Sequence, residues 1–183
     1  MRERQRKERS ALELWDIYDE KGALTGRTVE RGGRRLAPGE YHLCVCAVIV
    51  NGRGQVLCTR RAPEKEQAPG MWENPGGSVQ LGESSQEAMA RELLEETGLA
   101  PDPEQLRFCY RSKKRDFYMD VYLVFREVDP GELRLQPGET DDARWFPYEE
   151  WEQKARAGEI LCPSDKGDEN FYATLREMIR RRG

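Results

Sequence analysis

The residues best suited to chemistry are charged side chains that follow a glycine loop in the range 77–99. They are Glu83, Arg91, Glu92, Glu95 and Glu96. A helix turns by about 100° per residue, so the last three glutamates share one face, where each like-charged pair costs roughly a few tenths of a kcal/mol. Carboxylates combined with a free backbone carbonyl form an all-oxygen site that suits Mg²⁺ or Mn²⁺. The alternative is a solvated acidic face without a function.

A helix of about four turns must position these carboxylates. Ser84 and Glu87 are three residues apart and fit a capping box at its start. Gly98 stands where a left-handed C-terminal cap is expected. The residues between are mostly good helix formers. The side opposite the glutamates carries Met89, Ala90, Leu93 and Thr97.

The complete spacing is G-x5-E-x7-R-E-U-x-E-E-x-G-U, in which U is apolar, and it resembles the signature of the Nudix hydrolases. Every fixed position is met, by Gly77, Glu83, Arg91, Glu92, Leu93, Glu95, Glu96, Gly98 and Leu99. The resemblance implies the Nudix fold, an α/β/α sandwich with a mixed central sheet. It also implies metal-dependent hydrolysis of a phosphoanhydride (pyrophosphate) bond, in a nucleoside diphosphate linked to another group or in a nucleoside di- or triphosphate.

The resemblance also assigns metal ligands within this segment, which we call the Nudix box. Glu92 and Glu96 are expected to be the principal ligands of Mg²⁺ or Mn²⁺, and the carbonyl of Gly77 a further one. Glu95 is expected to be a third carboxylate ligand or the base that organises the attacking water. A divalent metal neutralises the phosphate oxygens and lowers the pKa of its bound water.

Two further roles are expected around the box. Arg91 pairs with an acid, for which Glu83 is the candidate, and holds the loop against the helix; the alternative is a surface ion pair worth less than about 1 kcal/mol. In this family an acid outside the box often serves as base, and Glu139 is our first choice. The other candidates are Asp120, Asp141 and Asp142.

The range 40–83 also resembles isopentenyl-diphosphate isomerase, which has the Nudix fold but moves a proton instead of hydrolysing. The shared residues are Glu40, Tyr41, His42, Thr59, Arg60, Arg61, Ala62, Lys65, Pro69, Gly70, Trp72 and Asn74. Gly76 stands where the isomerase has its proton-transfer cysteine, and Ser78 replaces a metal-binding histidine. The isomerase's later pair of glutamates falls near Tyr118 and Asp120. The missing acid/base pair and the intact box favour hydrolase over isomerase; a non-catalytic nucleotide-binding regulator is a third alternative.

The isomerase resemblance implies that Arg61 and Lys65 bind the substrate's phosphates, with solvated loop charges as the alternative. His42, the only histidine, is expected to be a hydrogen-bonded structural residue, with metal binding as the alternative. In this family, substrate specificity resides in loops outside the box. We expect them here at 62–70, 111–116 and 160–170.

The chain is predicted to be a charged N-terminal tail, 1–12, followed by a single Nudix domain, 13–183. Within that domain, 13–30 is expected to be an N-terminal β-hairpin, and 77–99 is the Nudix box. Other strands are predicted at 41–50, 55–61, 106–112, 117–125 and 143–146. Helices are predicted at 147–157 and 170–181.

Composition excludes several classes of protein. The chain of 183 residues has a net charge of −4, which argues against binding of duplex nucleic acid. The longest apolar run, 43–50, is too short to span a membrane, and no secretory signal is visible. We therefore expect a cytoplasmic enzyme that acts on a small phosphorylated substrate such as a nucleotide. Its hairpin and last helix could supply a homodimer interface. Reduced cysteines are expected at Cys44, Cys46, Cys58, Cys109 and Cys162.

Overall fold

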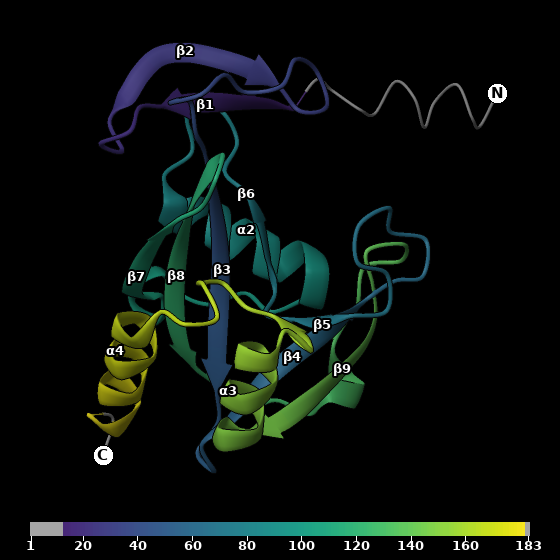
Figure 1. The fold of residues 1–183 in the computed structure, drawn as a ribbon. Coiled ribbons are helices and arrows are strands. Elements are labelled where there is room, and N and C mark those ends of the chain that lie inside the picture. The colour runs from purple at the N-terminus through teal and green to yellow at the C-terminus, as the bar shows by residue number, and fades with distance from the viewer. Residues whose placement is uncertain (1–12, 182–183) are drawn as a thin grey trace, which may run out of the picture.

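A computed structural model describes residues 13–181, so the charged segment predicted as a tail lies outside the described residues. Within 13–181, a mixed sheet of eight strands forms the centre of the molecule (Figure 1). Its strands are β3 (His42–Val50), β4 (Gln55–Arg61), β5 (Trp72–Glu73), β6 (Gly76–Ser78), β7 (Arg107–Lys113), β8 (Phe117–Phe125), β9 (Thr140–Pro147) and β10 (Ile160–Leu161). The path β10-β5-β4-β3-β8-β7 is extended by β6 against β3 and by β9 against β4.

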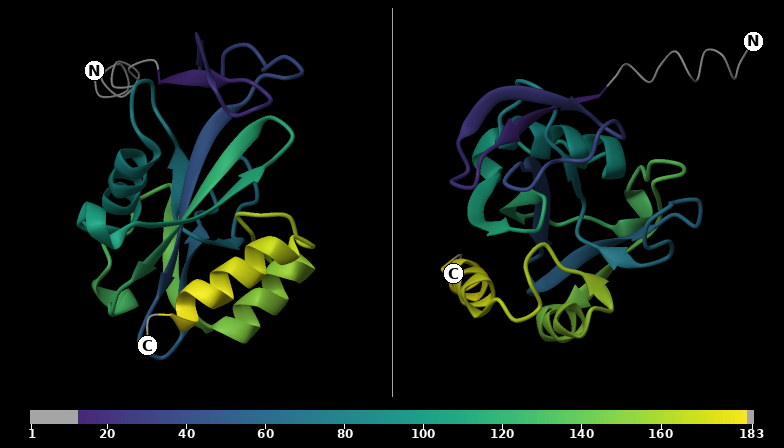
Figure 2. Two further views of the ribbon diagram at one scale, coloured as in Figure 1. Left: turned by 90° about the vertical axis from the view of Figure 1, so that its left-hand side faces the viewer. Right: turned by 45° about the horizontal axis from the view of Figure 1, so that its top comes forward.

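Helices cover both faces of this sheet, as the α/β/α prediction requires. Helix α2 (Ser85–Thr97) packs on one face, and α3 (Tyr148–Ala157) and α4 (Glu169–Arg180) pack on the other (Figure 2). Successive side chains of β3 point to opposite faces. Val45 therefore joins the core under α2, and Val48 joins the core under α3 and α4. The fold predicted from the family resemblance is confirmed.

An N-terminal hairpin forms a separate two-stranded sheet from β1 (Leu14–Tyr18) and β2 (Leu24–Glu30). It lies at the top of Figure 1 and is joined to the main sheet by an isolated bridge between Tyr18 and Tyr41. Ile17 of β1 is completely buried, so the hairpin packs onto the rest of the protein. The N-terminal hairpin predicted with the fold is present.

The long strands have nearly the bounds that their β-branched and aromatic patterns predict. The short strands β5, β6 and β10 were not predicted, because two or three residues carry no periodic signal. Strand β9 begins at Thr140, three residues before the predicted start. The polar pair before Ala143 does not suggest a strand, but its backbone pairs with β4.

The main sheet splits beside β3, and this split positions the Nudix box. Strands β3 and β4 pair only at two positions next to their turn. Beyond it, β4 pairs with β5, and β3 pairs with β6, with Val45 opposite Gly77 and Cys46 opposite Gly76. The glycine loop is therefore held in the sheet beside the helix that carries the glutamates.

All five cysteines are free, as predicted. Burial raises the pKa of Cys44 to about 12, because the surrounding protein desolvates its thiolate. None of the helices within 13–181 combines the length and the apolar character that crossing a membrane requires.

Candidate metal and active site

Helix α2 has the caps that its sequence predicts, and they fix which residues face inward. The Ser84 hydroxyl accepts from the Glu87 N–H at 3.2 Å, and the Glu87 carboxylate accepts from the Ser84 N–H at 2.9 Å. With the helix starting at this residue, its rotation about its own axis turns Glu92 and Glu96 toward the sheet. The two side chains are 14% and 8% exposed. Glu95 is 49% exposed, at the rim. A fully solvated acidic face is therefore wrong for the first two.

The predicted site residues come together around one cavity of about 250 Å³. They come from the box helix, from β6, and from the loops around β4 and β9. Of the predicted residues, those that line it are Arg61, Lys65, Gly77, Arg91, Glu92, Glu95, Glu96 and Glu139. Glu83 does not line the cavity. The hairpin side contributes Glu13 and Arg31, which the sequence did not indicate as site residues.

Two glycines bring the carboxylates against the backbone of β6. A Cβ added to Gly77 would overlap the carboxylate of Glu92 and lie 2.5 Å from its Oε2. The N–H of Gly76 donates to Glu96 Oε2 at 3.1 Å. Glycine is therefore required at Gly77 for the close approach of Glu92, and the backbone at this point is part of the same polar site.

Arg91 links the glycine loop to the helix. Its guanidinium donates to both carboxylate oxygens of Glu83 at 2.8 and 2.9 Å and to the carbonyl of Ser78 at 3.0 Å. It also donates to Glu92 at 2.8 Å and to Glu95 at 3.2 Å. The hydrogen bond from Arg91 is the main reason why the pKa of Glu83 lies below its usual value.

We predict that Arg91→Ala lowers the free energy of unfolding by about 2–3 kcal/mol, because it leaves two half-buried carboxylates without their cation. Arg91→Lys keeps the positive charge but cannot donate two parallel hydrogen bonds to one carboxylate. We expect it to lower the free energy of unfolding by about half as much. Urea denaturation measures both values, and Arg53→Ala, in the exposed β3–β4 turn, is the control. Equal losses for Arg91→Ala and Arg53→Ala would contradict the assigned role.

The electrostatics of the cavity fit a cation. Burial raises the pKa of Glu96 to about 8, with further contributions from Glu73 and Glu92, and burial also raises the pKa of Glu92. Within 13–181 no three side chains of His, Cys, Asp or Glu converge into a complete set of metal ligands. Two carboxylates and a carbonyl leave several positions for water and phosphate, which is the arrangement that Mg²⁺ prefers.

Glu73 is a site residue that sequence reasoning missed. It lies on β5 and accepts from Arg61 at 2.9 Å, and burial raises its pKa. Its negative charge is the first contribution after burial to the raised pKa of Glu96. The only available signal was its position between Trp72 and Asn74, both of which belong to the isomerase-like segment.

Glu139 is the only one of the four candidate bases that lines the cavity in the described residues, and it is ion-paired with Lys65. Asp120 is 1% exposed and receives two hydrogen bonds from Arg111, at 2.6 and 2.7 Å. Asp141 accepts from Arg60 at 2.8 Å, and Asp142 lies 3.6 Å from the same guanidinium.

A second cavity, of about 350 Å³, adjoins the first and shares the loop residues of β6 with it. Its walls include Cys44, Phe117, Met119 and Leu161. It is also lined by Asn74, whose side-chain nitrogen and oxygen are buried and form no hydrogen bond in the structure. Asn74 is therefore a buried amide whose hydrogen-bonding capacity the described residues do not satisfy.

His42 does not line the cavity of the Nudix box. Its ring stacks on Trp15 with centroids 4.2 Å apart and planes 9° apart, and its Nδ1 lies 3.6 Å from the sulfur of Cys44. Burial lowers its pKa to about 4. The structural interpretation of His42 is therefore favoured over metal binding.

We predict that His42 makes the protein less stable at acid pH. In the unfolded chain it binds a proton near pH 6.5, whereas the folded protein resists protonation down to about pH 4. The free energy of unfolding therefore falls as pH drops from 6.5 to about 4, by at most about 1.4 kcal/mol per pH unit. NMR titration of this single histidine measures the pKa. The free energy of unfolding is then measured against pH for wild type and for His42→Phe, and the difference between the two curves is the contribution of His42. Curves of identical shape would refute the prediction.

Comparisons with known proteins agree with this geometry. The family model described as NUDIX domain matches residues 40–162. An uncharacterised Nudix hydrolase of Listeria monocytogenes is 36% identical over 82% of this chain and 89% of its own length. An isopentenyl-diphosphate Delta-isomerase of Escherichia coli is 33% identical over 70% of this chain and 74% of its own. The crystal structure of DR0079 from Deinococcus radiodurans superimposes with a TM-score of 0.68 and 26% identity, covering 92% of this chain and 98% of that one.

The fold and the box define a Nudix protein, and these matches show that this chain belongs to the Nudix family. Within that family it is a hydrolase of pyrophosphate bonds. Nudix hydrolases generally use a divalent metal.

Proposed function

We propose that this enzyme cleaves the phosphoanhydride bond of a nucleoside diphosphate linked to another group, or of a nucleoside di- or triphosphate, with Mg²⁺ or Mn²⁺. The observation that carries the proposal is the convergence of the inward-facing Glu92 and Glu96 with Gly77 around a cavity that also holds basic side chains. This hydrolysis requires carboxylates that bind a cation and positively charged side chains that bind phosphate in the same cavity.

The residues present divide the work as follows. Glu92, Glu96 and the carbonyl of Gly77 hold the metal, and Glu95 at the rim is a third ligand or organises water. When bound, the ion supplies charge neutralisation for the phosphates and a lower pKa for its water. Arg61 binds the phosphates.

Proton removal is assigned to Glu139. In the structure its carboxylate is held by Lys65. A substrate phosphate competes for that ammonium, and the freed carboxylate then accepts the proton of the attacking water. The water oxygen forms its bond to phosphorus as the bridging P–O bond breaks, and the bridging oxygen leaves with the second phosphate.

One observation weighs against the isomerase reaction. A Cβ at Gly76 would overlap the carbonyl oxygen of Val45 and lie 2.7 Å from the Cα of Cys46. The backbone at this point therefore has no room for the cysteine that the isomerase uses, and the isomerase's partner acids are largely absent.

A substrate panel with Mg²⁺ tests the function. We expect release of phosphate or of a nucleoside monophosphate, with strong losses for Glu95→Gln and Glu96→Gln. If neither substitution changes the rate of hydrolysis, the assignment of these glutamates to a hydrolase active site is wrong. Incubation of isopentenyl diphosphate in D₂O tests the alternative, and deuterium entering the isoprenoid at a catalytic rate would establish an isomerase.

A further inference from the structure

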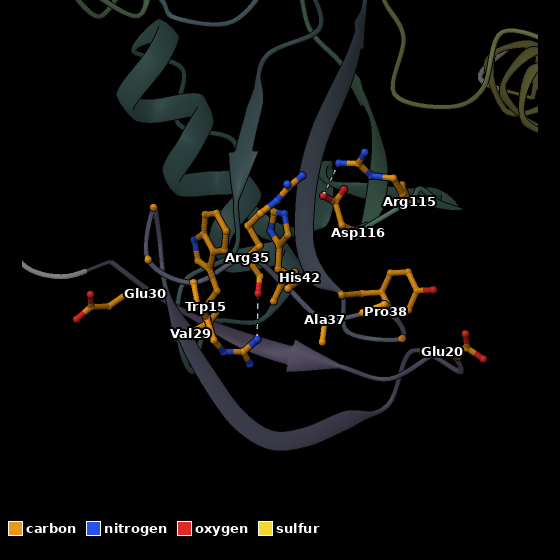
Figure 3. A pocket seen from close by; sticks show the side chains of 16 residues that line it. Trp15, Glu20, Val29, Glu30, Arg35, Ala37, Pro38, His42, Arg115 and Asp116 are labelled. Carbon is orange, nitrogen blue, oxygen red and sulfur yellow. Dashed lines mark hydrogen bonds and ion pairs between the residues drawn. The ribbon is translucent and has the colours of Figure 1, made fainter.

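A third cavity, of about 690 Å³, lies between the N-terminal hairpin, the segment 32–39 and the start of β3 (Figure 3). None of the residues assigned to the Nudix box lines it. Its volume is within the range of small-molecule sites. Its walls combine aromatic rings with arginines, so its chemistry differs from that of the acidic cavity at the box.

The aromatic wall is held by ring stacking and by one hydrogen bond. Trp15 stacks on His42 in near-parallel geometry, and Phe117 lies behind His42 with ring centroids 5.6 Å apart. The indole N–H of Trp15 donates to Glu13 at 2.9 Å, which fixes the orientation of the ring. Because the pKa of His42 is lowered, this stack is uncharged at neutral pH. A flat, preorganised aromatic pair suits the face of a planar heterocycle.

Another wall is formed by the loop 32–39, which a single carboxylate holds in place. Glu40 is 7% exposed and accepts from Arg27 at 2.5 Å, from Arg34 at 2.6 Å and from the N–H of Ala37 at 2.9 Å. Arg35 also lines the cavity, but unlike Arg27 and Arg34 it is not paired with Glu40. Its guanidinium forms no hydrogen bond or ion pair within residues 13–181. A guanidinium in that position can bind an anionic oxygen.

Other charges also face this cavity. Arg115 is 79% exposed and lies 3.3 Å from Asp116, and both line it. Glu20 and Glu30 line the rim. Arg35 is therefore the cation left for a ligand, and the acids disfavour a highly charged group deep inside. An uncharged ring with its phosphates directed away from the cavity fits this distribution.

The cavity adjoins the active site at two contacts. Trp15 donates to Glu13, which lines the cavity of the box, and the Nδ1 of His42 lies 3.6 Å from the sulfur of Cys44, which lines the second cavity. His42, Cys44 and Cys46 alternate onto one face of β3, and the two cysteines line the 350 Å³ cavity beside the box. The backbone of Val45, which pairs with Gly77 and whose side chain lies on the opposite face, is three residues from His42, or about 10 Å along the strand. This separation matches the reach of a nucleotide from its base to its second phosphate.

We propose that the Trp15–His42 cavity binds the base of the substrate, so that the substrate is a base-bearing nucleoside diphosphate derivative. The base stacks on Trp15, Arg35 contacts the sugar–phosphate portion, and the diphosphate reaches the box. The inference rests on the proposed function for the diphosphate end. The hairpin thereby becomes the part of the protein that selects nucleotides over other diphosphates.

Binding of ADP without metal tests the cavity directly. We expect Trp15→Ala to weaken the dissociation constant about tenfold or more, as loss of a base-stacking platform does. Trp15→Phe should recover most of the affinity, and Arg35→Ala should lose several-fold. Arg53→Ala, an exposed arginine at the far end of β3, is the control. Wild-type affinity in both Trp15→Ala and Arg35→Ala would overturn the proposal.

Two further measurements separate this inference from the proposed function. With Mg²⁺ present, inorganic pyrophosphate should compete with ADP, because both use the phosphate end; binding of ADP that pyrophosphate does not affect under that condition would overturn the single-substrate arrangement. With ADP-ribose and Mg²⁺, Trp15→Ala should raise KM about tenfold and leave kcat within about threefold. If Trp15→Ala hydrolyses ADP-ribose with an unchanged KM, the proposed base site is wrong and the hydrolase assignment stands. If the wild-type protein binds ADP in a way that depends on Trp15 but hydrolyses no diphosphate, the base site stands and the proposed hydrolase function is wrong.

Discussion

Glu96→Gln is expected to lower kcat by about 10²–10³-fold or more, because it removes a carboxylate from the metal site while preserving size and shape. Glu96 is the more buried of the two inward-facing glutamates, and its carboxylate also accepts from the N–H of Gly76. The amide of glutamine can still receive that hydrogen bond, so the loop should keep its position. The effect is therefore expected on metal binding and catalysis and not on the fold.

Stability gives an independent readout of the same variant. The folded pKa of Glu96, about 8, lies above its value in an unfolded chain. Metal-free protein therefore loses stability as pH rises from about 4.5 through 8, since the buried carboxylate must ionise without a counter-ion. We expect metal-free Glu96→Gln to melt at the same temperature as wild type or higher at pH 8. Mg²⁺ should raise the wild-type Tm and leave the variant nearly unchanged.

Two results would contradict this account of Glu96. One is a variant that keeps wild-type kcat at saturating Mg²⁺. The other is a metal-free variant that is markedly less stable at pH 8, which would make Glu96 a structural residue. Glu104→Gln, a substitution in the 3₁₀ turn after α2, is a matched control for loss of an acid far from the cavity.

Gly76→Cys is expected to destabilise the protein by about 3 kcal/mol or more and to create no isomerase activity. Any Cβ at this position meets backbone atoms of the paired strand β3, the carbonyl of Val45 and the Cα of Cys46, and a sheet interior cannot move them cheaply. Urea unfolding measures the loss, and deuterium exchange into isopentenyl diphosphate measures the activity.

The control for Gly76→Cys is a glycine with open space around its Cα. At Gly167 the position that a Cβ would take has no other atom within 4 Å, and φ is not positive. Gly167→Ala should therefore leave stability within about 0.5 kcal/mol of wild type. If Gly76→Cys folds as stably as Gly167→Ala and exchanges deuterium at a catalytic rate, both the steric argument and our choice of hydrolase are wrong.

Local signals account for what could be predicted from the sequence about the fold. The capping box at Ser84, the left-handed glycine Gly98 and the run of helix formers between them depend on neighbours within a few residues. The same holds for the β-branched strands. The spacing of the box acids added the family, because fixed intervals along one helix determine which side chains share a face.

Only the tertiary structure separated the roles of those acids. Glu92, Glu95 and Glu96 have the same side chain and the same predicted face, but the first and third are turned toward β6 and Glu95 stays at the rim. Glu139 lies beside the box because β9 pairs with β4. Glu73, on the unpredicted strand β5, could not be connected to Glu96 from the sequence.

The sequence by itself therefore determined the Nudix box, which depends on short-range spacing, and the family resemblance that the box carries implied the α/β/α architecture and the class of reaction. The tertiary structure decided which acids are buried together and why Gly76 and Gly77 must be glycines. It also placed Trp15 against His42, in a stack whose two residues lie far from the box in the chain. These features depend on contacts between distant segments, which the split of the sheet beside β3 creates and which sequence spacing does not encode.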